Sequence, residues 1–238
     1  MGSERQIPRG DVVETTPALQ PSLDTKLSGR YVTIVGMTIE HIILLYPHIS
    51  GEENAHVWDY MSHGPFNESS DFEAFMEAGL QSPDILFYSI ISADQPITSS
   101  GTLNVIGCAS YGSPNPENRS VEVGILMSAK LQRTPATTEA MYLMARHAFE
   151  DLGYRRYEWK CDSLNASSYR AALRLGFTYE GIFRQHMIVK GRNRDTAWFS
   201  IVDGEWPGVK NAFERWLDPS NFDENGLQWK KLEDFRSE

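Results

Sequence analysis

The sequence has little that would place it outside the ordinary intracellular globular proteins. It contains only two cysteines, Cys108 and Cys161, and neither belongs to a Cys-x-x-Cys pair. Such sparse use of cysteine fits a reducing compartment. The longest apolar run, near residues 42–46, is too short to cross a membrane. The first residues lack the apolar centre of a signal peptide. We therefore expect a soluble, cytoplasmic protein.

Several kinds of binding motif are also missing. The six histidines are scattered without metal-ligand spacing, so we expect no metal. No P-loop and no glycine-rich dinucleotide fingerprint is present. Positive charge is scarce, because 22 Lys and Arg oppose 32 Asp and Glu, for a formal net charge of −10. A surface of this sign repels phosphate backbones, and we expect neither nucleic acid nor a membrane as a partner. It suits a cationic ligand, although most acidic proteins are acidic only for solubility.

The chain is long enough for one sizeable domain with extensions. It has 238 residues, of which 41% are hydrophobic, which is enough to bury a real core. We expect a flexible tail over residues 1–28, one folded domain over residues 29–217 and an acidic extension over residues 218–238.

Hydrophobic periodicity alternates between strand and helix along the domain. Strands are predicted at 29–38, 85–91, 102–111, 120–128 and 156–162, and a hairpin joins 183–190 to 195–202. Helices are predicted between residues 39 and 82, from 134 to 152, from 165 to 175 and from 206 to 217. This order predicts an α/β layered fold (α+β) with a mixed, largely antiparallel central sheet flanked by helices.

The run LQRTPATTEA at residues 131–140 has the composition of a helix start. Thr134 fits the N-cap, where its hydroxyl can accept a backbone N–H, and Pro135 fits the first helical position. The next N–H groups lack acceptors within a helix and carry the positive end of its dipole: Ala136, Thr137 and Thr138. Arg133 adds a positive charge. The segment is either an anion site or simply a capped helix.

Two further segments carry candidate site residues. In the strand 120–128, alternation places Glu122, Gly124 and Leu126 on one face, and Gly124 is either a tolerated glycine or a point of close approach. In the helix after residue 163, Ser168 lies on the inward face and needs a polar partner, either a carbonyl one turn back or a ligand. Asn165 is either the helix cap or a ligand to a bound amide.

Together these segments resemble the GNAT superfamily of acyl-CoA-dependent N-acyltransferases, and most closely its RimJ/RimL-type branch. The similarity extends over about residues 29–217 and is most specific in the loop 132–137 and in the Asn-x-x-Ser at 165–168 followed by Leu-Gly-Phe. It implies a fold of the GNAT type. Pro135 and Thr137 depart from the small residues of the family loop, and Ala172 replaces the Tyr that many members have.

The resemblance implies an acetyl-CoA site, with acetyl-CoA as co-substrate. The pyrophosphate would bind the loop and helix start, and the pantetheine arm would pair with the strand and with Asn165. The full set of expected cofactor-binding residues is Val123, Gly124, Ile125, Leu126, Gln132, Arg133, Thr134, Ala136, Thr137, Thr138 and Asn165. Ser168 would stabilise or protonate the leaving thiolate.

The reaction implied is direct transfer of an acetyl group to a primary amine, either a small molecule or a protein N-terminus, in a monomer or homodimer. An alkyl ammonium has a pKa of about 10 and must lose a proton. Glu122 is the candidate base, directly or through water, although an ordinary exposed strand Glu is the alternative. Cys161 lacks the spacing of a covalent catalyst. A non-catalytic acyl-CoA-binding module is the alternative function.

The acceptor site is the least defined part. Residues 58–66 and the hairpin around Arg184, His186 and Arg194 are expected to line its mouth. The aromatic residues could equally belong to the core, and His186 could be an ordinary surface residue.

Overall fold

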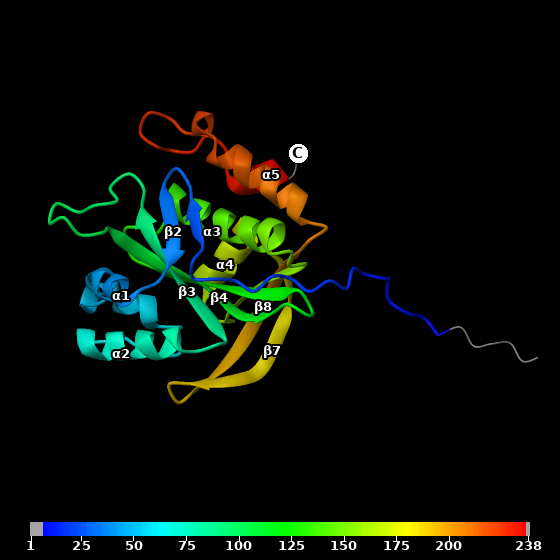
Figure 1. Cartoon of the computed structure of the whole chain (residues 1–238), viewed down its shortest axis with the longest axis horizontal. Helices are drawn as coiled ribbons and strands as arrows, with labels where there is room; N and C mark the ends of the chain where they lie inside the picture. Colours follow the sequence, from blue (N-terminus) through cyan, green and yellow to red (C-terminus); the bar gives the residue numbers. More distant parts are fainter. Residues whose placement is uncertain (1–6, 237–238) are drawn as a thin grey trace, which may run out of the picture.

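A computed structural model describes residues 7–236 and contains one eight-stranded sheet with helices on both faces (Figure 1). The strand order is β1-β2-β3-β4-β5-β6-β8-β7, and only the β5–β6 pair is parallel. The predicted fold class is confirmed. The strands are β1 (Lys26–Ser28), β2 (Val32–Gly36), β3 (Ile85–Ser92), β4 (Val105–Asn115), β5 (Ser120–Met127), β6 (Arg156–Asp162), β7 (Thr178–Val189) and β8 (Arg192–Val202).

The helices form two layers, one on each face of the sheet (Figure 1). One apolar cluster joins β-strands to α3 (Pro135–Arg146), α4 (Ala166–Leu175) and α5 (Trp206–Leu217). The other joins them to α1 (Ile39–Leu45), α2 (Ser69–Leu80) and the 3-10 segment η2 (Glu52–Trp58). Short turns η1 (Tyr46–His48), η3 (His147–Asp151), η4 (Pro219–Asn221) and η5 (Leu232–Arg236) complete the elements. Within residues 7–236, no helix combines the length and apolarity needed to span a membrane.

The two ends are more closely attached than the sequence predicted. Residues 7–17 are exposed, but from Ala18 onward the chain is held, because Ala18 N–H donates to Pro116 O at 3.0 Å and β1 pairs with β2. The prediction of a flexible tail up to residue 28 is therefore wrong for residues 18–28. The C-terminal extension also packs, through buried Leu232 and Phe235. The parts of these predictions that fall on residues 1–6 and 237–238 lie outside the described residues.

A single carboxylate connects the start of β2 to α3. Glu139 is buried, and it accepts the backbone N–H groups of Arg30, Tyr31 and Val32 at 2.8, 2.6 and 2.9 Å. Hydrogen bonds to an ionised acceptor are stronger than neutral ones. Gly29 precedes this turn, and a side chain there would collide with the Glu139 carboxylate. The contact fixes α3 over the sheet. It also turns Glu139, the first acidic residue of α3, toward β2.

Gly124 on β5 has a structural explanation. It pairs with Ser110 on β4, and a Cβ added to Gly124 would lie 2.5 Å from Ser110 Oγ. Ser110 is buried, so its hydroxyl has little room to move away. The close approach that a strand glycine suggests is made by the neighbouring strand.

Replacement of Glu139 by Gln is expected to lower the free energy of unfolding by about 2 kcal/mol, because a neutral amide must serve three backbone donors. Urea unfolding followed by circular dichroism measures the change. Glu77→Gln, at an exposed position of α2, is the control and should stay within about 0.5 kcal/mol of the wild type. An equal midpoint for both variants would contradict the anchoring role of Glu139.

Gly124→Ala is expected to cost about 1–3 kcal/mol of stability through overpacking against Ser110. The double variant Ser110→Ala/Gly124→Ala should recover most of this loss, because it removes the colliding hydroxyl. Thermal and urea unfolding of the two single variants and the double variant form the cycle. Additive effects in the cycle would show that the Ser110 contact does not explain the glycine.

Candidate active site

The parallel strands β5 and β6 separate after a short paired stretch. Ser120, Val121 and Glu122 pair with residues 156–158, and within the described chain no ladder joins residues 123–127 to residues 159–162. On their outer sides, β5 remains paired with β4 and β6 with β8. We call this opening the fork. Its edges present backbone groups to an extended ligand, in the manner of strand addition.

Four predicted cofactor-binding residues lie along the β5 edge of the fork. Val123 and Leu126 are buried in opposite apolar layers, and Gly124 and Ile125 are half-buried between them. Their backbone is therefore the part available to a ligand in the fork.

Helix α3 begins at Pro135, as predicted, with Thr134 as N-cap. The predicted cap hydrogen bond is wrong: Thr134 Oγ1 donates to Leu131 O at 2.7 Å, and Thr137 Oγ1 donates to the same carbonyl. Both hydroxyls therefore close the preceding loop rather than cap the helix. Among residues 7–236, no acceptor is found for the backbone N–H groups of Ala136 and Thr137. No acid occupies the first turn.

Positive charge surrounds this helix start. Arg133 is exposed and adopts a positive φ of 58° immediately before the cap. Arg174 of α4, which the sequence analysis missed, donates from Nη1 to Thr138 Oγ1 at 3.0 Å. Thr138 is buried. Gln132 has a supporting role, because its side-chain amide donates to Met127 O at 3.3 Å. The helix start thus has the donors and the charge to hold an anion.

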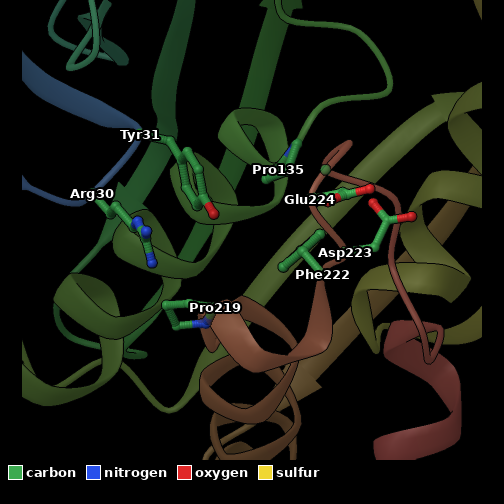
Figure 2. Close-up of a pocket in the computed structure, with 8 residues that line it drawn as sticks. Arg30, Tyr31, Pro135, Pro219, Phe222, Asp223 and Glu224 are labelled. Carbon is green, nitrogen blue, oxygen red and sulfur yellow. The ribbon is translucent and has the colours of Figure 1, made fainter.

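A pocket of about 350 Å³ opens beside α3 (Figure 2). It lies between Pro135, Tyr31 at the start of β2 and the C-terminal extension. Asp223 and Glu224 line the extension's side of it. Arg30 also lines the pocket, so its charge is mixed, with one cation against two carboxylates. The unpaired N–H groups of α3 have no acid in their own turn and are the better anion site.

The start of α4 is built as the sequence suggested. Asn165 is the N-cap, and its side-chain oxygen accepts Ser168 N–H at 3.0 Å. The favoured reading of Asn165 as a cap is confirmed. Its amide nitrogen has no acceptor among the described residues, so capping leaves that group available to a ligand. Leu164 lies outside the helix and is 71% exposed, so it does not share the buried face of Ser168.

Ser168 lies on the α3–α5 side of the sheet, against β6. Its Oγ accepts the indole N–H of Trp159 at 3.0 Å. This leaves the Ser168 O–H as a donor, and the Cys161 sulfur is one acceptor for it. The nearby Cys161 has a raised pKa because the thiol is buried, and a hydrogen bond from Ser168 opposes this rise. A raised pKa keeps Cys161 a thiol, which agrees with its reading as a packed strand residue.

Glu122 lies on the opposite side of the sheet, at the last paired position before the fork. It accepts a hydrogen bond from Lys160 Nζ at 2.9 Å. Lys160 also lies 3.3 Å from Glu158 and 4.0 Å from the centroid of the Trp198 ring. Lys160, Glu158 and Trp198 were not identified from the sequence. Glu122 is thus a partner in an ion pair and not an isolated exposed residue.

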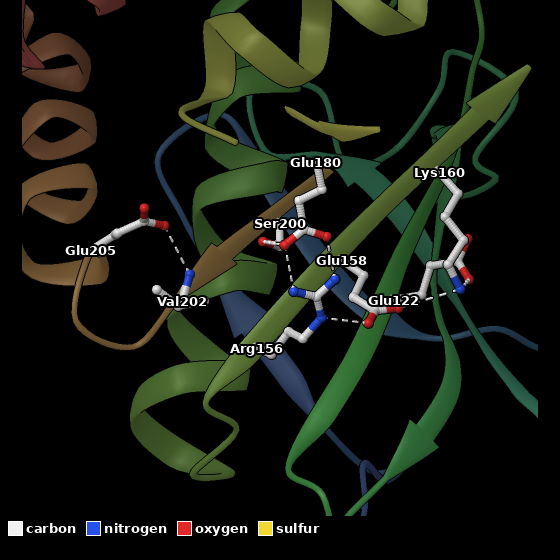
Figure 3. Close-up of polar contacts among 8 residues, drawn as sticks. All are labelled: Glu122, Arg156, Glu158, Lys160, Glu180, Ser200, Val202 and Glu205. Atoms are coloured by element: carbon white, nitrogen blue, oxygen red, sulfur yellow. Dashed lines mark hydrogen bonds and ion pairs between the residues drawn. The ribbon is translucent and has the colours of Figure 1, made fainter. Parts of the chain in front are cut away.

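The ion pairs continue along the sheet face (Figure 3). Arg156 donates to Glu158 at 2.7 Å and to Glu180 of β7 at 2.6 Å. The network therefore contains three carboxylates and two cationic groups. The excess of negative charge suits an additional cation. Figure 3 shows that Lys160 lies at the end of this row nearest Glu122.

The two segments expected to line the acceptor mouth, residues 58–66 and the β7–β8 hairpin, are in contact. Lys190, in the turn between β7 and β8, donates to Trp58 O at 2.8 Å. Trp58 is buried against Phe66 and Phe72, so these aromatic rings belong to the core. His186 is exposed, and its ring contacts the Thr196 hydroxyl at 3.0 Å.

Comparison with known proteins identifies relatives over most of the chain. Residues 32–178 match the family described as Acetyltransferase (GNAT) domain. A GCN5-related N-acetyltransferase from Brucella melitensis has 40% identity and a TM-score of 0.87, covering 94% of this chain and 98% of its own. A probable acetyltransferase of the GNAT family from Chromobacterium violaceum has 31% identity and a TM-score of 0.76, covering 86% and 100%.

Similarity to curated proteins is more partial. The ribosomal-protein-serine acetyltransferase of Escherichia coli is 30% identical over 102 residues, which are 42% of this chain and 57% of that protein. The chain spans less than two thirds of the length of the curated relatives it matches.

Within residues 7–236, no group of His, Cys, Asp and Glu side chains is placed to hold a metal ion. With a matched domain of more than half its length and a relative that is 40% identical over nearly the whole chain, this protein belongs to the GNAT acetyltransferase family.

Proposed function

We propose that the protein transfers an acetyl group from acetyl-CoA to a primary amine by direct attack within a ternary complex. The observation that carries this proposal is the fork between β5 and β6, with ionisable groups beside it and a helix start, that of α3, without an acid in its first turn. The family uses acetyl-CoA. The thioester of that molecule supplies the activated acetyl group.

The residues of this chain fit such a ligand. The free N–H groups of Ala136 and Thr137, with Arg133, would hold the pyrophosphate. The backbone of residues 123–126 would pair with the pantetheine arm along the fork, and the free amide of Asn165 would bind the same arm. Arg174 adds positive charge behind the first turn of α3. Pro135 occupies the position where a missing N–H costs nothing.

The two catalytic candidates, Ser168 and Glu122, lie on opposite faces of the sheet. We therefore assign each of them a different proton transfer. Ser168 lies on the side of the sheet that α4 covers, where its O–H, once turned away from Cys161, can donate a proton to a sulfur leaving through the fork. Glu122 faces the acceptor side, where its carboxylate can take a proton from an incoming ammonium. Because the fork lies between them, neither residue needs to contact the other.

The acceptor is proposed to be a cationic primary amine. The network of Glu122, Glu158 and Glu180 exceeds its two cationic partners by one charge, and the Trp198 ring already holds an ammonium group. The Escherichia coli relative is named for acetylation of a ribosomal protein at serine. A protein N-terminus and a small-molecule amine both fit this chemistry.

Calorimetric titration should detect acetyl-CoA binding in the micromolar range, with a matching rise in Tm. Arg133→Gln is expected to weaken binding by about fivefold, because it removes charge from the helix start. Arg192→Gln, on the distant hairpin, is the control and should bind as the wild type. Dephospho-coenzyme A tests whether the terminal phosphate contributes. Absence of binding at millimolar ligand would eliminate the proposed function.

Ser168→Ala is expected to lower kcat about a hundredfold while changing the acetyl-CoA Kd less than about threefold, because the hydroxyl acts on the leaving sulfur. Ser167→Ala, an exposed neighbour on α4, is the matched control. Thiol release during an amine screen gives kcat, and calorimetry gives Kd. An unchanged kcat in Ser168→Ala would exclude this proton donor, and no turnover by the wild type would favour a non-catalytic binding module.

A further inference from the structure

Lys160 places a primary amine of the protein itself at the mouth of the fork. It follows Glu158, the last paired residue of β6, by two positions and therefore lies on the same face of the strand. From the unpaired part of β6 its side chain reaches Glu122 on β5. The ammonium group thus bridges the two strands where they begin to separate.

The surroundings of this amine are those that an acceptor amine requires. A carboxylate that can take a proton lies 2.9 Å away, at Glu122. A second carboxylate at 3.3 Å and the Trp198 ring at 4.0 Å hold the ammonium in place. The lysine stem has four rotatable bonds, which allow Nζ to move from the ion pair into the fork.

We propose that Lys160 is a self-acetylation site, whose amine takes the acetyl group when no external amine occupies the fork. This inference rests on the proposed function, because acetyl-CoA bound in the fork is the donor. The Lys160 amine is tethered, and tethering gives a group near the reacting carbonyl a high effective concentration. The ion pairs favour the ammonium form, so the reaction should be slow compared with acetylation of a good external acceptor.

The covalent step balances with the groups at hand. The Lys160 ammonium gives one proton to Glu122, which passes it to solvent. The neutral Nζ attacks the thioester carbonyl carbon, the N–C bond forms and the C–S bond breaks. The second proton leaves the nitrogen as the amide forms and balances the departing thiolate. The products are acetyl-lysine, the thiol of coenzyme A and one proton.

Lys210 provides a matched comparison within the same chain. It is also held by a carboxylate, with Nζ 2.8 Å from Glu150, but it lies on α5 away from the fork. Its side chain is 32% exposed, against 17% for Lys160. Acetyl-CoA in solution therefore reaches Lys210 more easily, although the hydrogen bond to Glu150 raises the pKa of Lys210 and reduces its neutral form. A reaction at Lys160 that is faster than at Lys210 and saturates with acetyl-CoA therefore indicates donor bound at the fork.

The experiment incubates the full chain with acetyl-CoA in a buffer without amines, and quantifies acetylation at each lysine by peptide mass spectrometry over time. Lys160 is expected to react about tenfold faster than Lys210 or more, with a rate that saturates as acetyl-CoA increases. Glu122→Gln should abolish the advantage of Lys160 without changing Lys210. Lys160→Arg keeps the positive charge and should leave acetylation of Lys210 unchanged.

A Lys160 rate equal to or below that of Lys210 would overturn the inference, as would an unchanged rate in Glu122→Gln. Calorimetry with acetyl-CoA on the same samples distinguishes a failure of the self-acetylation proposal from a failure of the proposed function. Binding without Lys160 acetylation overturns self-acetylation alone, whereas absence of binding overturns the proposed function as well. Thermal unfolding of each variant shows that the folded chain is being compared.

Discussion

The separation of β5 from β6 is the constraint on which the rest of the site depends. Parallel pairing stops at Glu122 and Glu158, yet both strands continue, because β4 and β8 hold their outer edges. Each strand therefore keeps its conformation while its inner edge lacks a partner. Unpaired backbone groups inside a protein are costly unless they are satisfied. In the proposed complex, an extended ligand with amide groups would satisfy them.

The proposed anion site depends on where the first acid of α3 points. Glu139 is the earliest acid of α3, and it is committed to three backbone N–H groups at the start of β2. Its carboxylate accepts hydrogen bonds from β2 and does not reach the start of its own helix. The N–H groups of Ala136 and Thr137 therefore carry the positive end of the helix dipole without a neighbouring acid. The same contact stabilises the fold and keeps the helix start electropositive.

Local features of the site could be predicted from the sequence, and long-range ones could not. Thr134 and Pro135 mark a helix start because capping depends on neighbouring residues, although the hydroxyl made a different hydrogen bond from the one expected. Asn165 as a cap follows from the same local chemistry. The ion pair of Lys160 with Glu122 could not be predicted, because the two residues are 38 positions apart and only the β5–β6 register brings them together. Arg174 reaches Thr138 across 36 positions for a similar reason.

Side chains that interact with the fork lie on both faces of the sheet. This arrangement suits the transfer of an acetyl group between two different molecules. Alternation along β6 turns Trp159 and Cys161 toward α4 and Ser168, and turns Glu158 and Lys160 toward Glu122. In the proposed reaction, a group on one face would meet the leaving sulfur and a group on the other would meet the attacking amine. An amine that approaches must compete with Lys160 for Glu122, because the carboxylate already holds an ammonium. The proposed selectivity for cationic acceptors rests on the negative charge that the network leaves unbalanced, since a neutral ligand gains nothing from displacing that lysine.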